Sequence, residues 1–357
     1  AYAKEYLQDY PEVKLCKIST PYPFPEKFVL SCLEGVDEVI CLEELSPFIE
    51  AEVTKLIGKH RLNIKVYGKE SGYVKTSGEN SADYVAKVLS DFLKIPSQEA
   101  GIYLGDMPDL PVRPPVLCAG CPHRASFYAV KKAMEGKNAY FCGDIGCYTL
   151  GNAMPLDMVD TCLCMGAGIT MAQGFHWVDK EGTCFAFVGD STFFASGMTG
   201  IVNAVYNEAD MILCVLDNST TAMTGHQPHP GTGKNMMGDI VDKISIEHIL
   251  EGMGVKKIVT VNPLDLNKSV EVIKDCASLP GVKAIIFKSP CIALFKPEKK
   301  LCISDKCIQC KKCIREIGCP AISTVKGKVT INEDLCTGCG LCSQVCPVNA
   351  IGGDLDE

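Results

Sequence analysis

TCFAFVGDSTFFASGMTGIVNAVYNEADMILCVLDNSTTAMTGHQPHPGTG, residues 183–233, is the segment that decides the fold of this chain. It contains an apolar strand that ends at Gly189, a helix, a second apolar strand, and a polar loop that opens with Asp217 and Asn218. Strands that are apolar on both faces are typical of a parallel sheet covered by helices, and such sheets bind ligands beyond the carboxyl ends of their strands. The segment therefore predicts an α/β fold with a parallel sheet and a ligand site near Asp190 and Asn218.

Asp190 and Asn218 place oxygen ligands at the ends of the two predicted strands. Residues 191–217 separate them, which is the length of one crossover connection, so the two strands are expected to be neighbours. A carboxylate, an amide oxygen and loop carbonyls suit Mg²⁺, which keeps further positions for phosphate oxygens. We interpret the pair as a magnesium-diphosphate site. An ordinary sheet with a Gly-Asp turn is the alternative that the spacing alone leaves open.

The C-terminal residues 297–357 contain a cysteine repeat. C-x2-C-x2-C starts at Cys307 and again at Cys336, and a Cys-Pro pair follows each group. This is the pattern of bacterial ferredoxins with two [4Fe–4S] clusters, in which the fourth cysteine of each half binds the cluster of the other half. Zinc is the alternative, which this spacing does not favour. The predicted ligand sets are Cys307, Cys310, Cys313 and Cys346 for one cluster, and Cys336, Cys339, Cys342 and Cys319 for the other.

Composition limits the class of protein. A chain of 357 residues with 47% apolar content is long enough for two or three domains with full cores. The net charge of −8 argues against a nucleic-acid surface, and no segment reads as a membrane span or a signal peptide. The 22 cysteines without secretory features indicate a reducing cytoplasm and metal binding. Cysteines in predicted apolar strands are expected to be small buried side chains; they are Cys16, Cys41, Cys162, Cys164, Cys184 and Cys214.

The domain order is predicted from the composition and the apolar pattern along the chain. Residues 1–70 alternate helices with strands at 13–18, 36–42 and 64–67, and because such a unit normally opens with a strand, we expect polypeptide to precede Ala1. Residues 71–115 are polar and proline-rich, with a helix at 81–93, and read as a connecting segment. Residues 116–296 form the diphosphate-binding domain, and residues 297–357 form a small α+β ferredoxin-like domain with the two clusters.

The diphosphate-binding domain opens with a CxxC pair, Cys118 and Cys121, followed by His123. The loop after the strand at 138–142 carries Asp144, which we include among the cofactor-binding residues. A strand at 160–164 leads into Gly166 and Gly168, which open the next helix and permit close approach of backbone to a cofactor. Further strands are predicted at 257–261 and 283–288, with helices at 240–253 and 264–276.

The two strand ends resemble the diphosphate-binding signature of thiamine diphosphate enzymes, Gly-Asp-Gly followed about 26 residues later by Asn-Asn. It stands here as Gly189-Asp190-Ser191 and Asp217-Asn218. The resemblance implies that Asp190, Asn218 and the backbone carbonyl of Thr220 bind Mg²⁺. Ser191 and Asp217 depart from the signature at positions that do not supply the ligating side chains. It also implies a transketolase C-terminal-like fold for residues 1–70.

Thiamine diphosphate combined with one-electron clusters points to oxidative decarboxylation of a 2-oxo acid. The motifs CAGCPHR, GDIGCYTLG, DTCLCMGAGI, VGDSTFF and DNSTTAMTGHQPHPG, followed by a ferredoxin-like domain, resemble the 2-oxoacid:ferredoxin oxidoreductases. Among them the chain is most similar to the C-terminal portion of the large (alpha) subunit in the indolepyruvate:ferredoxin oxidoreductase family. The resemblance implies an aryl pyruvate and coenzyme A as substrates, and aryl-acetyl-CoA, CO₂ and reduced ferredoxin as products.

The same resemblance implies further site residues. Relatives hold a third [4Fe–4S] cluster near the thiamine ring, and the matching cysteines are Cys118, Cys121, Cys147 and Cys291; unrelated structural thiols are the alternative. The loop after Asn218 offers His226 and His229, with Thr221 beside them, as catalytic or cofactor-binding groups. His123 is a third catalytic candidate. Each histidine could instead bind the diphosphate or lie behind the metal.

The resemblance also implies partners. Thiamine enzymes are activated by a Glu on a pyrimidine-binding domain, which is expected from a missing N-terminal portion or from a separate chain, together with a smaller second subunit and ferredoxin. No membrane or nucleic-acid partner is expected. Two other functions stay open: a non-oxidative thiamine decarboxylase with a ferredoxin domain, and an electron-transfer subunit whose α/β domain is only a scaffold.

Overall fold

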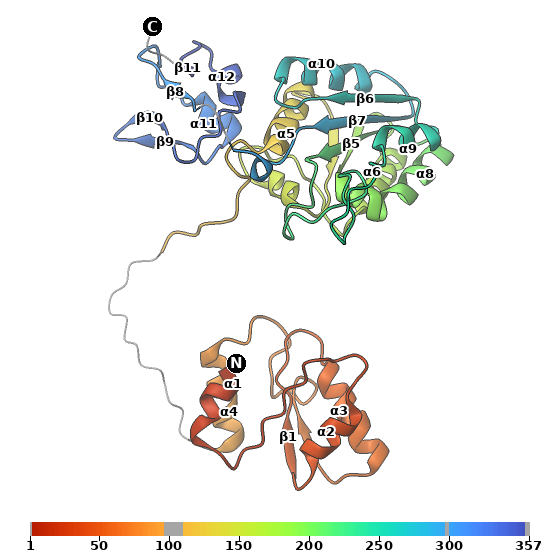
Figure 1. Cartoon of the computed structure of the whole chain (residues 1–357), viewed down its shortest axis with the longest axis vertical. Helices are drawn as coiled ribbons and strands as arrows, with labels where there is room; N and C mark the ends of the chain where they lie inside the picture. The colour runs from red at the N-terminus through yellow and green to blue at the C-terminus, as the bar shows by residue number, and fades with distance from the viewer. Residues whose placement is uncertain (1, 96–109, 297–299, 354–357) are drawn as a thin grey trace. The chain divides into compact units, whose positions relative to one another are not determined.

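The computed structural model describes residues 2–95, 110–296 and 300–353. The chain divides into two compact units, Ala1–Pro111 and Val112–Glu357, which are described separately (Figure 1). The second unit contains both the predicted diphosphate-binding domain and the cysteine repeat.

The first unit is a small α/β assembly. Strands β1 (Glu38–Ile40) and β2 (Lys65–Tyr67) pair in parallel, and helices α2 (Glu26–Leu33) and α3 (Phe48–His60) bury an apolar stripe against them. Helix α1 (Tyr2–Tyr6) and the short helix η1 (Leu7–Asp9) pack on α4 (Ala82–Leu93), whose N-terminus is capped by the Ser81 hydroxyl. The predicted connecting segment therefore contributes a helix to this unit.

The predicted strand at residues 13–18 is wrong: the described chain forms no strand there. Lys14 and Lys17 interrupt the apolar residues, and Leu15 remains 50% exposed, so the segment has too little apolar surface to bury on a sheet. Prolines at positions 11 and 21 also flank it and limit its pairing.

The second unit is built on a five-stranded parallel sheet in the order β3-β4-β5-β7-β6. This confirms the predicted α/β class with a parallel sheet. The bounds are β3 (Ala139–Cys142), β4 (Thr183–Gly189), β5 (Met211–Asp217), β6 (Lys257–Val261) and β7 (Val282–Lys288).

Helices cover both faces of this sheet (Figure 1). Side chains of β4 and β5 alternate between two cores: Phe185, Phe187 and Ile212 face α5 (Pro122–Ala133) and α10 (Leu266–Ala277), whereas Val188 and Leu213 face the other layer. That layer contains α6 (Ala167–Val178), α8 (Met198–Tyr206) and α9 (Ile246–Gly252). Burial on both faces explains why these strands read as continuous apolar runs.

Residues 300–353 form a small α+β region that we call the ferredoxin-like region. It contains β8 (Cys302–Ile303), α11 (Lys312–Ile317), β9 (Ile322–Val325), β10 (Lys328–Ile331), α12 (Leu341–Val345) and β11 (Ile351–Gly352). It contains two antiparallel strand pairs, β9 with β10 and β8 with β11. The second pair joins the beginning of this region to its end. Ile317, Leu341 and Val345 belong to the same apolar core as Phe127 and Phe187 of the α/β domain.

Three further expectations are corrected. Residues 160–164 form only a single bridge, Thr161 to Cys142, so that segment is a loop in the described structure. Cys162 and Cys164 are exposed and Cys16 is half-buried, whereas Cys41, Cys184 and Cys214 are buried as predicted. The helix expected from residue 240 begins at Ile246, because residues 240–244 are exposed loop.

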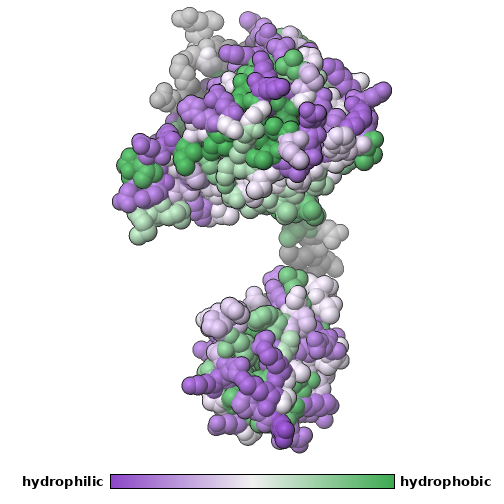
Figure 2. Space-filling view, turned by 90° about the vertical axis from the view of Figure 1, so that its right-hand side faces the viewer, coloured by the Kyte–Doolittle hydropathy of each residue, from purple (hydrophilic) through white to green (hydrophobic). Residues whose placement is uncertain are grey.

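In the part of the chain that the structure describes, no helix is both long and apolar enough to cross a bilayer. Polar residues cover much of the face in Figure 2, with apolar residues in patches between them.

Candidate functional site

The carboxyl ends of β3, β4, β5 and β7 bring four loops to one edge of the sheet. Asp144 follows β3, Asp190 follows β4, Asn218 follows β5 and Cys291 follows β7. Gly189 of β4 pairs with Leu216 of β5, so the strands that end at Asp190 and Asn218 are direct neighbours, as their spacing predicted.

Asp190 is the centre of this edge. Its side chain is almost completely buried, and its Oδ2 accepts hydrogen bonds from the backbone N–H groups of Asn218 at 3.1 Å and Ser219 at 2.8 Å. Oδ1 accepts from the Ser191 N–H at 2.8 Å. The carboxylate thereby ties the end of β4 to the loop after β5.

Asn218 is buried beside Asp190. Its side-chain oxygen accepts from the Thr220 N–H at 3.2 Å, and its Nδ2 lies 3.1 Å from Nε2 of His123. Burial lowers the pKa of His123 to about 4, against the opposing effect of Asp190. The imidazole is therefore neutral, and its Nε2 accepts the amide hydrogen of Asn218.

Asp144 closes the other side of the site. It is fully buried, and its Oδ1 accepts from the Gly166 N–H at 2.7 Å while its Oδ2 accepts from the Tyr148 hydroxyl at 2.8 Å. Burial raises the pKa of this carboxyl. Gly168 lies two residues further along, in the first turn of α6, where an added Cβ would stand 2.5 Å from the Gly143 carbonyl oxygen. The start of α6 therefore approaches the end of β3 backbone to backbone.

Negative charge is concentrated at this edge. Asp217 lies next to Asn218, and burial together with the charge of Asp190 raises its pKa. Lys288 stands 3.4 Å from Asp217 Oδ2 but is half exposed. Two buried carboxylates with one partly solvated lysine leave negative charge that a divalent cation would offset. The Asn218 amide and the Thr220 carbonyl would be neutral oxygen ligands for such a cation. The donor set fits Mg²⁺.

The loop after Asn218 separates the two predicted loop histidines. His229 is buried, stacks on Phe194, and places Nε2 3.1 Å from Asp190 Oδ2. Its Nδ1 accepts from the Gly231 N–H at 3.2 Å, so Nε2 is the ring nitrogen that carries a hydrogen toward Asp190. That Nε2 has no hydrogen bond to any described group. His226 lies on an exposed turn with φ of 62°, and Thr221 accepts its backbone N–H at 3.0 Å.

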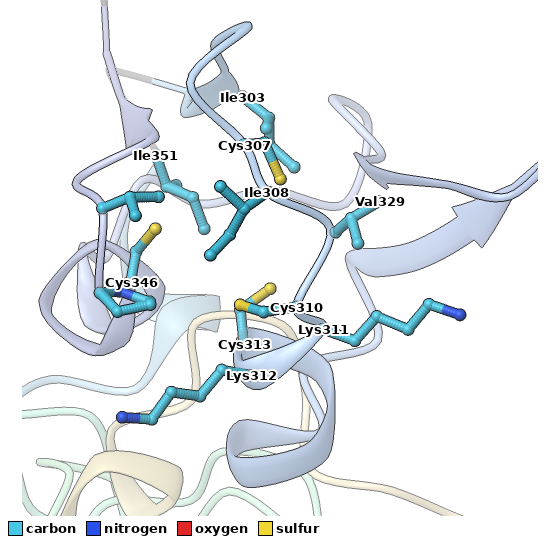
Figure 3. Close-up of a pocket in the computed structure, with 12 residues that line it drawn as sticks. Ile303, Cys307, Ile308, Cys310, Lys311, Lys312, Cys313, Val329, Cys346 and Ile351 are labelled. Carbon is cyan, nitrogen blue, oxygen red and sulfur yellow. The ribbon is translucent and has the colours of Figure 1, made fainter.

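The thiols of Cys307, Cys310, Cys313 and Cys346 point into one cavity of the ferredoxin-like region, which we call the first cluster site (Figure 3). Ile303, Ile308, Val329 and Ile351 complete its wall, whereas the amino groups of the two neighbouring lysines point away. An apolar cavity with four inward thiols suits a cluster in which each thiolate binds its own iron.

Cys319, Cys336, Cys339 and Cys342 line a second cavity, which we call the second cluster site. Burial, together with the neighbouring thiols of Cys339, Cys319 and Cys336, raises the pKa of Cys342 to about 12, as expected for thiols that share one space. Both cavities combine three thiols from one half of the repeat with the fourth from the other half. In residues 2–95, 110–296 and 300–353, no three His, Cys, Asp or Glu side chains are grouped tightly enough for a single ion.

We call the other four predicted cluster ligands, Cys118, Cys121, Cys147 and Cys291, the CxxC site; some of these thiols influence one another's pKa. Burial raises the pKa of the Cys147 thiol, and Cys118 and Cys291 raise it further. Burial raises the pKa of Cys121 to about 12, with Cys118 again contributing. Cys291 donates its backbone N–H to the Asn218 carbonyl at 2.9 Å, so this site adjoins the loop that carries the proposed metal ligand.

Two functional candidates were not predicted from the sequence. Tyr148 bonds Asp144 and lies 3.3 Å from the Thr192 hydroxyl, and its ring occupies the space that a side chain at position 189 would need. Arg124, one residue after His123, reaches the ferredoxin-like region. A tyrosine four residues after an aspartate is too common a pattern to signal the first contact, and nothing local signals the second.

Comparison with known proteins agrees with this geometry. Residues 144–287 match the family described as thiamine pyrophosphate enzyme, C-terminal TPP binding domain, and residues 329–352 match the 4Fe-4S binding domain. The chain is 40% identical over 348 residues to indolepyruvate oxidoreductase subunit IorA of Methanothermobacter thermautotrophicus, covering 95% of this chain and 56% of that protein. It is 38% identical over 365 residues to IorA of Archaeoglobus fulgidus, covering 98% of this chain and 58% of that protein. The chain therefore spans little more than half the length of these relatives.

Proposed function

We propose that this chain, which belongs to the same family as the IorA subunits of indolepyruvate oxidoreductases, is the thiamine- and cluster-binding part of a 2-oxoacid:ferredoxin oxidoreductase. The observation that carries the proposal is the placement of the thiamine-binding edge and the thiol sets within one compact unit. An electron acceptor beside a thiamine site is needed for oxidative decarboxylation and has no use in simple decarboxylation.

The proposed reaction converts an aryl 2-oxo acid and coenzyme A into aryl-acetyl-CoA and CO₂. Two electrons leave the substrate carbon, two oxidised ferredoxins each accept one, and the thiol of coenzyme A releases its proton to solvent. Thiamine diphosphate, when bound, supplies the thiazolium carbon that attacks the oxo group and the ring that accepts electron density as CO₂ leaves.

Asp190, Asn218 and the Thr220 carbonyl would hold Mg²⁺ and, through it, the diphosphate. Gly189, Ser191, Gly166 and Gly168 shape the backbone around that position. Asp144 anchors the start of α6 through the Gly166 N–H at 2.7 Å. These residues would bind and orient the cofactor.

His123 and His229 are the candidates for proton transfer or oxyanion binding, because both are buried at the site. His123 is oriented by Asn218 at 3.1 Å, and His229 by the Gly231 N–H. His226 is exposed in this structure and would need movement of its loop to act. The activating Glu, a smaller second subunit and ferredoxin would come from other polypeptide.

The test is dye or ferredoxin reduction by the anaerobically purified protein with its partner subunit, with aryl pyruvate and coenzyme A supplied separately and together. Reduction that needs both substrates is expected. Aldehyde release without coenzyme A and without reduction of the acceptor would instead indicate a non-oxidative decarboxylase.

Asp190→Asn should abolish this activity together with retention of thiamine diphosphate, because the substitution removes the charge that the cation offsets. Asp242→Asn is the matched control, since Asp242 is exposed. If Asp190→Asn retained the cofactor and activity of the parent protein, the placement of the metal site would be wrong.

A further inference from the structure

Arg124 is a buried cation between two proposed cluster sites. Its side chain is only 4% exposed, and it lies in the first turn of α5, directly after the CxxC loop. A buried guanidinium requires several acceptors or a negative partner, because desolvation of its charge is costly. The groups that surround Arg124 therefore indicate its role.

One branch of the guanidinium reaches the ferredoxin-like region. Nη1 donates to the carbonyl oxygens of Ile317 at 2.8 Å and Gly318 at 2.9 Å, and these residues immediately precede Cys319 of the second cluster site. An added Cβ at Gly318 would lie 2.4 Å from the Pro155 ring, so this backbone lies close against the α/β domain.

The other branch holds the CxxC loop. Nη2 donates to the Leu117 carbonyl at 2.5 Å and lies 3.5 Å from that of Cys118. The same loop also contacts the second cluster site directly. Gly120 packs so closely against Thr337 that an added Cβ would stand 1.7 Å from the Thr337 hydroxyl. Arg124 thus fixes the two prospective ligand loops to each other.

The charge of Arg124 is not matched by a carboxylate in these contacts, since all four of its partners are carbonyl oxygens, and its Nε has no described partner. Burial lowers its pKa, and the groups that favour its charged form are the thiols of Cys319, Cys121, Cys339 and Cys118. Those thiols come from both prospective cluster sites. A cluster gains one negative charge on reduction, and a fixed positive charge in a buried setting stabilises the reduced state.

We propose that Arg124 is a positioning residue that locks the CxxC loop to the second cluster site and that its buried charge raises the reduction potential of the cluster held by Cys319, Cys336, Cys339 and Cys342. The inference rests on the proposed function, because it requires clusters at these thiols. Its effect would favour transfer of an electron from the thiamine side into the ferredoxin-like region.

The experiment is a redox titration of the anaerobically purified protein followed by electron paramagnetic resonance, with iron counted per chain. The signal of the second cluster site is assigned as the one lost in Cys319→Ser. In Arg124→Gln, the ratio of reduced to oxidised cluster at a fixed poise is expected to fall about tenfold, which is about 59 mV for one electron. Arg124→Lys, which keeps the charge but loses the fork, should titrate close to the parent protein.

Lys131→Gln is the matched control on the same helix. Lys131 also donates to two carbonyl oxygens, those of Pro155 and Leu156 at 2.7 Å each, and its removal should leave the potential unchanged.

An Arg124→Gln protein with full iron and the parental potential overturns the inference, as does an Arg124→Lys protein whose potential falls by the amount expected for loss of the charge. If Arg124→Gln does not retain iron, the lysine variant decides alone. Failure of the proposed function is distinguished by the parent protein itself, which would then release aldehyde without reducing the acceptor while its clusters still titrate.

Discussion

Substitution of Gly168 by alanine tests the backbone contact on which the site depends. The new Cβ would lie 2.5 Å from the Gly143 carbonyl oxygen and 3.1 Å from that of Cys142, whereas ordinary contact begins at 3.4 Å. Both atoms are backbone at the end of β3, so no side chain can move aside. The start of α6 must shift by about 1 Å, and overpacking of this kind costs about 1–3 kcal/mol.

Gly174 on the same helix provides the control. Among the described atoms, nothing lies within 4 Å of a Cβ added at Gly174, so alanine there should stabilise the protein by about 0.5–1 kcal/mol through helix propensity. Subtracting the two variants removes most of the propensity effect and leaves the contact with β3. For a unit of this size, a difference of about 1–3 kcal/mol corresponds to roughly 2–12 °C in melting temperature.

The assay is urea and thermal unfolding of both variants beside the parent, with thiamine diphosphate affinity measured by calorimetry. Gly168→Ala should unfold earlier and bind the cofactor more weakly, because α6 carries the Gly166 N–H that bonds Asp144. Gly174→Ala should bind it as the parent does. Equal stability of the two variants would refute the close approach of α6 to β3.

Two further predictions concern the same unit. Tyr148→Phe should destabilise the protein by about 1–3 kcal/mol in chemical unfolding, because the buried Asp144 carboxylate loses its hydroxyl donor. The control Tyr206→Phe, at a residue that is 83% exposed, should not change the free energy of unfolding measurably. If Tyr148→Phe also left the free energy of unfolding unchanged, the hydroxyl bond would contribute little. Cys319→Ser should remove about four irons per chain in metal analysis while the exposed Cys302→Ser retains them all, and equal iron in both proteins would contradict the assignment of the second cluster site.

Local patterns predicted much of the fold and of the site. The strands that end at Gly189 and Asp217 are buried on both faces, so their continuous apolar sequences identified them as strands of a parallel sheet. The length of the connection between them correctly predicted that they are neighbours. The cysteine repeat has a fixed spacing, so the sequence also predicted which four thiols line each cavity of the ferredoxin-like region.

Long-range contacts and loop geometry could not be predicted in this way. Arg124 meets Ile317 across 193 residues, and no local pattern encodes that contact. The turn after Thr221 decides that His229 enters the site and His226 does not, although both lie in one polar loop. The segment at 13–18 contains four apolar residues and suggests a strand, but composition alone cannot reveal that few of these side chains find a surface to cover.

The apolar core that the α/β domain and the ferredoxin-like region share has a mechanical consequence. Ile317, Leu341 and Val345 fill the same interior as Phe127 and Phe187, and Gln344 clamps the start of α10 through bonds to the Leu264 carbonyl and the Leu266 N–H. The ferredoxin-like region therefore cannot move as a separate domain relative to the α/β domain without exposing that apolar core to water. Electrons would have to cross fixed distances, and oxidation of the cluster thiols would disturb the apolar core that also supports the parallel sheet.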